Sequence, residues 1–541
     1  MASSFHLDWS PLPMSFVNAL RRSFVVAAAA AFLAGCATTS MAPDPARVAP
    51  KANDSVVVLS VTGNTAQVGA ADSITLLRVD TASTGAPSER HVLSQVAPGL
   101  SRDTSLFVGT LPAGSYRITQ MGHAATRQFL TINEAMSERI GRFQVAAGQG
   151  VDLGRLLVTP VNLNVVVGRS TRERSNLDML RQAAPQYMSF FPEGKAANGW
   201  LAERHERDRV EEYALAVPVG ADNPVQMADG SVVMGSRLGS ALVRNPEGRW
   251  RVLRSDRLES LLSVKPVDLP DTLLVAVGEF RTLMRLPKGA ERFVPVNPGN
   301  LPQGNLIFVA GNAKDGWVVA SQSGKTVGLY RSASFDNGDW KLLRSEDVGP
   351  SFWSGANQFW IWDTPQGLGY AVSDGRIHFL NLASGVWTER SSPKGSRLIA
   401  LAQDVPGHLG ALTSPGGGFG GVFATLYTSA DDGVNWKEIK GEFNVKVSPP
   451  RRLPNGDLLL PGGVFSKPEL HASTDGGTTW ARRGDITLDQ RLVVLPSGQL
   501  LAISAGRSGL FDVRHSGNGG ATWRTEFTNF DRQAYEAQQK K

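Results

Sequence analysis

The chain is short of the residues that most often carry covalent or metal chemistry. Among its 541 residues are one cysteine, Cys36, eight histidines and seven tyrosines. A single cysteine excludes an internal disulfide, a cysteine-based zinc site and a CxxC redox centre. The histidines are scattered, and the sequence contains neither an HExxH motif nor a G-x-S-x-G elbow. We therefore predict no metal and no cofactor, and assign no catalytic residue.

Charge of one sign and long hydrophobic runs are also scarce. The net charge is +6, with charged residues at 19% of the chain, which is too dilute to predict binding to nucleic acid. The apolar run at residues 24–33 is too short to span a bilayer, which takes about 20 residues. Glycine and proline, at 57 and 31 residues, are by contrast abundant. Their excess over the usual share of about 12% indicates many turns and a β-rich fold.

The N-terminal segment has the organisation of an export signal that ends at the only cysteine. Arg21 and Arg22 precede the apolar run and fit either the general or the twin-arginine export route. Leu-Ala-Gly-Cys at residues 33–36 resembles the lipobox of bacterial lipoproteins. The resemblance implies that the thiol of Cys36 is acylated and that residues 1–35 are removed as a signal peptide. An ordinary signal peptide that happens to contain a cysteine is the alternative.

A short polar stretch separates this signal from the first folded unit. Residues 36–53 are rich in alanine, threonine and proline, so we expect a flexible tether. In the same family, an aspartate directly after the acylated cysteine favours the inner membrane. This chain has Ala37 at that position, so the resemblance implies an outer-membrane location. The expected place of the protein is therefore the cell envelope, anchored by lipid and facing the periplasm or the exterior.

Two further segments precede the largest part of the chain. Residues 54–167 contain short β-branched runs broken by turn residues, which predict strands. The turn at 111–116 resembles that of transthyretin-like and carboxypeptidase-regulatory-like β-sandwiches, which implies a small β-sandwich stalk. Residues 168–215 form a charged link with helices predicted at 176–184 and 201–215.

An aromatic residue recurs through the second half of the chain. The gaps between successive copies are 43, 47, 47, 49, 44 and 43 residues, and each copy follows an apolar strand and a glycine-bearing turn. A period near 45 predicts four-stranded propeller blades. We therefore predict an all-β fold with a seven-bladed propeller at residues 216–527 and a tail at 528–541. The aromatics are Trp250, Phe293, Trp340, Trp387, Trp436, Trp480 and Trp523.

The last three of these aromatics, Trp436, Trp480 and Trp523, each form the final residue of a longer motif, Ser-x-Asp/Asn-x-Gly-x-x-Trp. This motif resembles the Asp box, or BNR repeat. Ser and Asp side chains can hydrogen-bond the turn backbone, and glycine tolerates positive φ. The resemblance implies a structural turn with its Trp wedged between blades, and not a catalytic carboxylate. The motif residues are Ser429, Asp431, Gly433, Trp436, Ser473, Asp475, Gly477, Trp480, Ser516, Asn518, Gly520 and Trp523.

Asp-box propellers include sialidases, sortilin-like receptors and photosystem-assembly factors. The sialidase resemblance implies three arginines that grip a carboxylate, a tyrosine nucleophile activated by a glutamate, and an acidic acid/base residue. The Arg-Ile-Pro motif of that family is missing, and only Tyr370 is expected on an inner strand. Four arginines recur just before the turns and are interpreted as repeat features, namely Arg244, Arg285, Arg331 and Arg514.

Aromatic residues also mark the face opposite the boxed turns. Trp360 and Trp362 point to one side of a strand, so they form either blade core, which we favour, or a platform for sugars or a protein partner. Trp353 in a connecting loop and Phe419 in a glycine-rich loop are further candidate binding residues. The basic pair at 451–452 is expected to be solvated, with the rim of the funnel as the alternative.

These observations predict a lipid-anchored envelope protein whose propeller face binds or assembles with a protein or a glycan. No complete catalytic set is visible, so an enzyme is the less favoured interpretation. The alternative is a divergent sialidase-like glycoside hydrolase. Such an enzyme would place two carboxylates about 5–10 Å apart in the central funnel, whereas a binding ring would expose apolar and aromatic surface without such a pair.

Overall fold

A computed structural model of the chain describes most of the residues after the predicted signal. Cys36, Trp353 and Phe419 lie outside the described residues, so their placement stays a prediction. The described ranges are 38–64, 71–80, 89–123, 128–161, 164–172, 175–204, 208–336, 338–348, 359–414, 424–440, 445–446, 448–464, 467–487, 490–505 and 510–531.

The first domain is a ten-stranded mixed sheet, in which the pairs β2–β9 and β1–β4 are parallel and the other described pairs are antiparallel. Hydrogen bonds link its strands in the order β10-β9-β2-β5-β4-β3-β6-β7, with β1 on β4 and β8 on β6. The strands are β1 (Thr38–Met41), β2 (Asp54–Gly63), β3 (Ser73–Arg78), β4 (Glu89–Val96), β5 (Thr104–Pro112), β6 (Gly114–His123), β7 (Gln128–Thr131), β8 (Phe143–Val145), β9 (Gly150–Val161) and β10 (Asn164–Arg169).

The central strand of this sheet is buried on both faces because its two sets of alternating side chains have different partners. Val57 and Leu59 of β2 face a core shared with β3, β5, β6, β9 and the helix α2 (Glu134–Ile140). Val56 and Val58 face the opposite way and pack against α3 (Asn176–Ala183) and the 3-10 helix η2 (Pro185–Phe190). A second 3-10 turn, η3 (Pro192–Gly194), follows.

Of the two helices predicted in the linker, the structure contains the first and a shortened form of the second. The first is present as α3, where the Ser175 hydroxyl caps the amide of Leu177 at 3.1 Å. The second is shorter than expected, because α4 spans only Val210–Ala216 and residues 201–204 are not helical. Arg204 pairs with Glu211 and Glu212, at 3.3 and 3.2 Å, so its side chain binds the first turn of α4.

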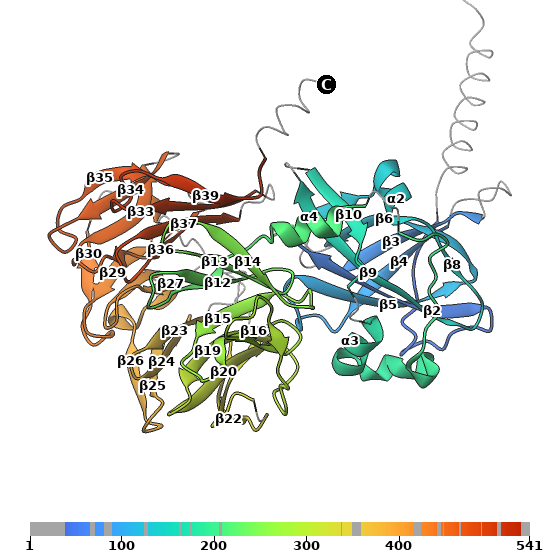
Figure 1. Ribbon diagram of the computed structural model, residues 1–541, viewed down its shortest axis with the longest axis horizontal. Coiled ribbons are helices and arrows are strands. Elements are labelled where there is room, and N and C mark those ends of the chain that lie inside the picture. Colours follow the sequence, from blue (N-terminus) through green and yellow to red (C-terminus); the bar gives the residue numbers. More distant parts are fainter. Residues whose placement is uncertain are drawn as a thin grey trace, which may run out of the picture.

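The second half of the chain forms seven separate sheets arranged in a ring, which confirms the predicted all-β fold and the seven-bladed propeller (Figure 1). Each blade takes its strands in chain order from the centre outward, and a 3-10 turn η4 (Pro393–Gly395) precedes blade five. Blade one consists of β11 (Asp222–Gln226), β12 (Val232–Ser236), β13 (Ser240–Arg244) and β14 (Trp250–Arg254); blade two of β15 (Leu261–Pro266), β16 (Thr272–Gly278), β17 (Thr282–Pro287) and β18 (Val294–Pro295); and blade three of β19 (Asn305–Asn312), β20 (Gly316–Ser323), β21 (Thr326–Ser332) and β22 (Lys341–Asp347). Blade four consists of β23 (Phe359–Thr364), β24 (Gly367–Val372), β25 (Arg376–Asn381) and β26 (Trp387–Ser391), and blade five of β27 (Arg397–Gln403), β28 (Leu409–Ser414), β29 (Thr425–Ser429) and β30 (Lys437–Ile439). Blade six consists of β31 (Val445–Lys446), β32 (Arg451–Arg452), β33 (Leu458–Val464), β34 (Lys467–Ser473) and β35 (Ala481–Asp485), and blade seven of β36 (Gln490–Val494), β37 (Leu500–Ala505), β38 (Phe511–Ser516) and β39 (Arg524–Thr528).

An apolar cluster fills each junction between neighbouring blades, and each cluster contains one of the seven recurring aromatics. Trp340, for example, is 3% exposed between blades two and three. Phe293 is also buried, whereas the other five are half-buried and pack against their clusters, so all seven place apolar area between adjacent sheets. From the junction of blades seven and one onward they are Trp250, Phe293, Trp340, Trp387, Trp436, Trp480 and Trp523.

The ring closes through side chains rather than through a strand shared by the two ends of the propeller. Blade one consists of β11–β14 and blade seven of β36–β39. Between them Trp250 contacts Phe527, with ring centres 5.5 Å apart. Arg244 donates to the buried carboxylate of Glu526 at 2.6 and 3.0 Å. Closure therefore depends on this apolar and ionic contact.

The three Ser-x-Asp/Asn-x-Gly turns repeat one hydrogen-bond pattern. In the first, the Ser429 hydroxyl donates to Asp431 and accepts from the amide of Gly433, both at 2.8 Å. Asp431 in turn accepts from the amide of Asn435 at 2.8 Å. The glycine of each turn has φ between 86° and 89°, a region that L side chains rarely adopt. The other two turns use Ser473, Asp475, Gly477 and Ser516, Asn518, Gly520 in the same way.

Candidate functional site

A large cavity forms a channel along the axis of the propeller. Its volume is about 960 Å³. The first strands of blades one to five and of blade seven contribute to its wall, and blade six contributes Ser448, Pro449 and Arg451. Gly99 and Arg102 of the N-terminal domain also line it. The channel is therefore formed by two domains that lie side by side (Figure 1).

One wall of the channel is apolar. It contains Phe308 of β19 and Phe359, Trp360 and Trp362 of β23. The two tryptophans are half-buried, and they also pack into the cluster between blades four and five. The indole of Trp362 lies against Gly369, where a Cβ would come within 2.4 Å of the ring. Trp360 and Trp362 are thus placed partly in the core and partly on the channel wall.

The opposite wall is charged. Arg451 of β32 forms an ion pair with Asp404, the residue after β27, and the side chain of Arg451 is only 14% exposed. The expectation that the basic pair at 451–452 is solvated is therefore wrong for Arg451. Arg491 of β36 is exposed to the channel and donates to the carbonyl of Ala221. These contacts join residues of different blades, and no local sequence pattern predicts them.

The N-terminal domain adds a third guanidinium at the mouth of the channel. Arg102 donates to both oxygens of Asp222, at 3.1 and 2.9 Å. Desolvation by the surrounding protein lowers the pKa of Arg491, Asp222 raises it, and the positive charges of Arg451 and Arg102 lower it further. Arg451 and Arg102 therefore each lie close enough to Arg491 to repel its charge.

A buried polar cluster holds the N-terminal domain on the propeller. Asp103 accepts from the Ser260 hydroxyl at 2.8 Å and pairs with Arg237 at 3.1 Å. Glu279 accepts from the amides of Arg102 and Asp103, at 2.6 and 2.5 Å. Burial, followed by the charge of Asp103, raises the pKa of Glu279 to about 7. For Asp103 burial acts in the same direction, but Arg237 and Arg102 hold its pKa below the ordinary value.

This docking occurs on the face opposite the boxed turns. Arg237 and Glu279 lie in the turns between the second and third strands of blades one and two. Gly99 approaches Gly324, which occupies the same kind of turn in blade three. Part of the face that the sequence analysis expected to bind partners is therefore occupied by the N-terminal domain.

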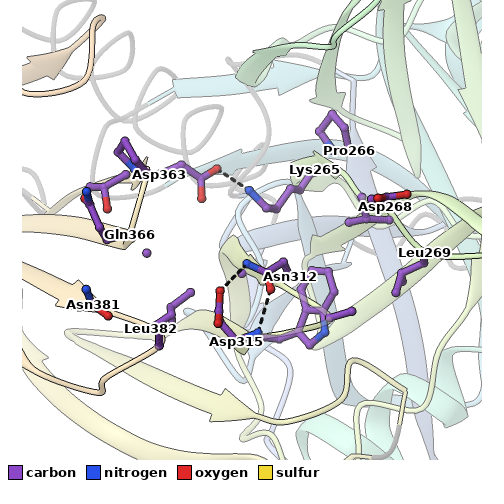
Figure 2. Close-up of a pocket in the computed structure, with 18 residues that line it drawn as sticks. Lys265, Pro266, Asp268, Leu269, Asn312, Asp315, Asp363, Gln366, Asn381 and Leu382 are labelled. Carbon is purple, nitrogen blue, oxygen red and sulfur yellow. Dashed lines mark hydrogen bonds and ion pairs between the residues drawn. The ribbon is translucent and has the colours of Figure 1, made fainter.

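A second cavity of about 530 Å³ lies on the boxed-turn face, between blades two, three and four (Figure 2). Lys265 and Asp363 form an ion pair across it at 3.0 Å. Asn312 donates to Asp315 at 3.1 Å within one turn of its wall. Because these polar groups already satisfy one another, this cavity is a weaker candidate than the channel.

The geometry of Tyr370 does not suit a nucleophile. Its hydroxyl donates to Glu346 at 2.6 Å, but the side chain is fully buried on β24 between blades three and four. Burial raises the pKa of Tyr370, and the Glu346 carboxylate raises it further. An attacking phenolate needs substrate access and a lowered pKa, so this Tyr–Glu pair has the opposite properties.

The acidic residues of the channel are also engaged. Among the residues that the structure describes, Asp222, Asp363 and Asp404 line the channel, and each is ion-paired with a cation. The recurring arginines bind other groups outside the channel lining, such as Glu526 for Arg244 and the Leu382 carbonyl for Arg331. Within the described ranges, no three histidine, cysteine, aspartate or glutamate side chains gather as metal ligands. In the same ranges, no helix is both long and apolar enough to cross a membrane.

Comparisons with known proteins reach the level of fold. No family model and no curated protein matches the chain. A puromycin-hydrolysing peptidase of Mycobacterium tuberculosis is 12% identical with a TM-score of 0.41, and the match covers 59% of this chain and 55% of the peptidase. YCF48 bound to D1 peptide is 16% identical with a TM-score of 0.37, covering 53% of this chain and 91% of YCF48.

The WD40 β-propeller domain of Doa1 is also 16% identical, with a TM-score of 0.35 and coverage of 57% of this chain and 98% of that domain. Likeness at these scores carries no argument about ligand or activity. The chain is a seven-bladed β-propeller protein with an N-terminal β domain.

Proposed function

We propose that this protein is a non-enzymatic binding or assembly module of the cell envelope, and that its propeller channel engages a protein partner. The observation that carries the proposal is a wide channel with one aromatic wall and one arginine-bearing wall. Seven clusters hold its shape from blade to blade. A rigid concave surface with apolar area and a few oriented charges suits recognition.

The hydrolase alternative receives no specific support. The paired state of Asp222, Asp363 and Asp404 leaves the described channel without a free carboxylate pair for general acid and base. Tyr370 is buried with a raised pKa. We also propose that the three Ser-x-Asp/Asn-x-Gly turns are Asp boxes, since their side chains satisfy turn amides in the manner that such a box requires.

A photo-crosslinking experiment tests the channel as the binding surface. We expect a photoreactive amino acid at Pro496, which is exposed and lines the channel, to capture an envelope protein in living cells. The same probe at Val434, 54% exposed on an outer turn, is the matched control and should capture little. Equal capture at both positions, or capture only at Val434, would assign binding to another surface.

We further propose that the mature protein is anchored by lipid on Cys36, which supports the envelope and outer-membrane assignment. The support is the Leu-Ala-Gly-Cys sequence at residues 33–36 after a basic and apolar leader. Replacing Cys36 with serine should abolish incorporation of labelled palmitate and leave uncleaved precursor, because a hydroxyl cannot replace the acylated thiol. Mass spectrometry of the wild-type N-terminus should find an acylated cysteine. A wild-type mature chain without acyl groups would refute the anchor.

A further inference from the structure

Arg491 is the one guanidinium of the arginine-bearing wall without an ion-pair partner among the described residues. Arg451 is paired with Asp404, and Arg102 with Asp222. Arg491, by contrast, donates to the Ala221 carbonyl, and its side chain is open to the channel. A guanidinium in such a site binds a carboxylate more strongly than it binds a neutral carbonyl.

Three polar atoms in residues of the same channel are buried without a hydrogen-bond partner in the described structure. They are Asn305 Oδ1, Trp362 Nε1 and Gln403 Nε2. The Asn305 side chain as a whole is 8% exposed. These atoms have almost no exposed surface, so a ligand can pair with one only if the side chain turns towards the channel. An orphaned buried polar group costs about 1–3 kcal/mol, and a ligand that induces such a turn gains affinity. A peptide backbone offers both a donor for the oxygen and acceptors for the two N–H groups.

The aromatic wall favours a peptide over a sugar. A sugar-stacking platform needs an open ring face. Trp362 lies against Gly369, and both Trp360 and Trp362 contribute to the cluster between blades four and five. Their remaining exposed edges, together with Phe308 and Phe359, suit apolar side chains.

We propose that the channel is a composite site for an extended peptide segment that carries a carboxylate. Arg491 binds this carboxylate, and Arg451 and the N-terminal domain's Arg102 complete the positive surroundings. This inference rests on the proposed binding function and adds the chemical class of the ligand. The carboxylate belongs either to an acidic side chain or to the C-terminus of the peptide.

The test uses the full chain in detergent and an array of nine-residue peptides. Each peptide is made in three forms. The first has a free C-terminus and neutral side chains, and the second has acidic side chains and a C-terminal amide. The third, neutral form has neutral side chains and a C-terminal amide. Carboxylate-bearing forms should bind about ten-fold or more tightly than the neutral form. The first two forms distinguish a C-terminal from a side-chain carboxylate.

Variants then assign the carboxylate to the arginines. Arg491→Gln should weaken binding of the best peptide about ten-fold or more, with partial retention in Arg491→Lys. Arg102→Gln should weaken binding, whereas Asp222→Asn should strengthen it because a competing carboxylate is removed. Arg249→Gln, 80% exposed on the β13–β14 turn, is the matched control and should bind normally. Melting temperatures identify any variant that misfolds. If Arg491→Gln or Arg102→Gln misfolds, the affinities of Arg491→Lys and Asp222→Asn test the proposal instead.

Several outcomes would overturn the inference. Equal binding of the neutral and carboxylate forms would refute the carboxylate while leaving the binding function intact. Unchanged affinity in Arg102→Gln would refute the composite site. Binding of acidic oligogalacturonides without binding of any peptide would refute the peptide. Failure of every peptide together with no crosslinking at Pro496 would refute the proposed function itself.

Discussion

Replacing Glu526 with alanine is expected to lower the free energy of unfolding by about 3–5 kcal/mol, because it leaves a buried charge without its partner. Arg244 and Glu526 are each 2% exposed at the junction of blades seven and one. Glu526 also accepts from Arg524 at 2.6 Å and from the indole of Trp250 at 3.3 Å. Chemical denaturation of the variant and the wild type would measure the loss.

An exposed ion pair of the same type provides the control. Arg285 and Asp271 are 37% and 71% exposed, so Asp271→Ala should change the unfolding free energy by less than about 0.5 kcal/mol. A loss in Glu526→Ala as small as this would mean that the ring is closed by its apolar contacts alone.

The loss should also depend on pH. Burial raises the pKa of Glu526, but hydrogen bonds and charge from Arg244 and Arg524 outweigh it and lower the pKa to about 2. A group whose pKa is lowered by folding stabilises the protein above its ordinary pKa and loses that contribution as pH falls. The stability difference between wild type and Glu526→Ala should therefore be full above pH 5 and shrink towards pH 2.

The second large effect is expected at the junction of the two domains. Asp103→Ala should cost about 3–5 kcal/mol, because Asp103 is 2% exposed and its removal leaves Arg237 buried without a carboxylate. The hydroxyl of Ser260 also loses its acceptor. Calorimetry should then resolve separate unfolding of the N-terminal domain and the propeller, where the wild type unfolds in a coupled transition.

A surface aspartate in the N-terminal half controls for the loss of charge. Asp178 on α3 pairs with Arg181, and both side chains are at least half exposed. Asp178→Ala should leave the calorimetric profile unchanged. An unchanged profile for Asp103→Ala as well would mean that other contacts suffice to couple the domains, such as the packing of α4 against Leu157, Leu238 and Leu258.

The propeller could be predicted because its signals are local and repeated. Each blade ends in the same short frame of strand, turn and aromatic, and a period near 45 residues fits one four-stranded sheet. The signals of the helix predicted at 176–184 are equally local, because its Ser cap and its apolar residues lie within one short segment. The expected helix was wrong for residues 201–204, where Arg204 instead pairs with Glu211 and Glu212 of α4. Charge spacing along a helix does not predict these two ion pairs.

The candidate site could be predicted only in part. Trp360 and Trp362 were identified from their alternation on one strand, and the structure places them between core and channel. The charged wall was missed because Asp404 and Arg451 are 47 residues apart, and Arg102 and Asp222 are 120 apart. No motif links such positions, since their meeting depends on how blades are stacked around the ring.

The sequence by itself determined the number of blades, the all-β class and the aromatic at each blade junction. These follow from residues that interact within one repeat or with the next, so a periodic pattern suffices. Only the tertiary structure decided that the N-terminal domain covers part of one face and that its arginine enters the wall of the channel. The reason is physical: ion pairs between distant segments form only after ring closure and domain docking have fixed their distance.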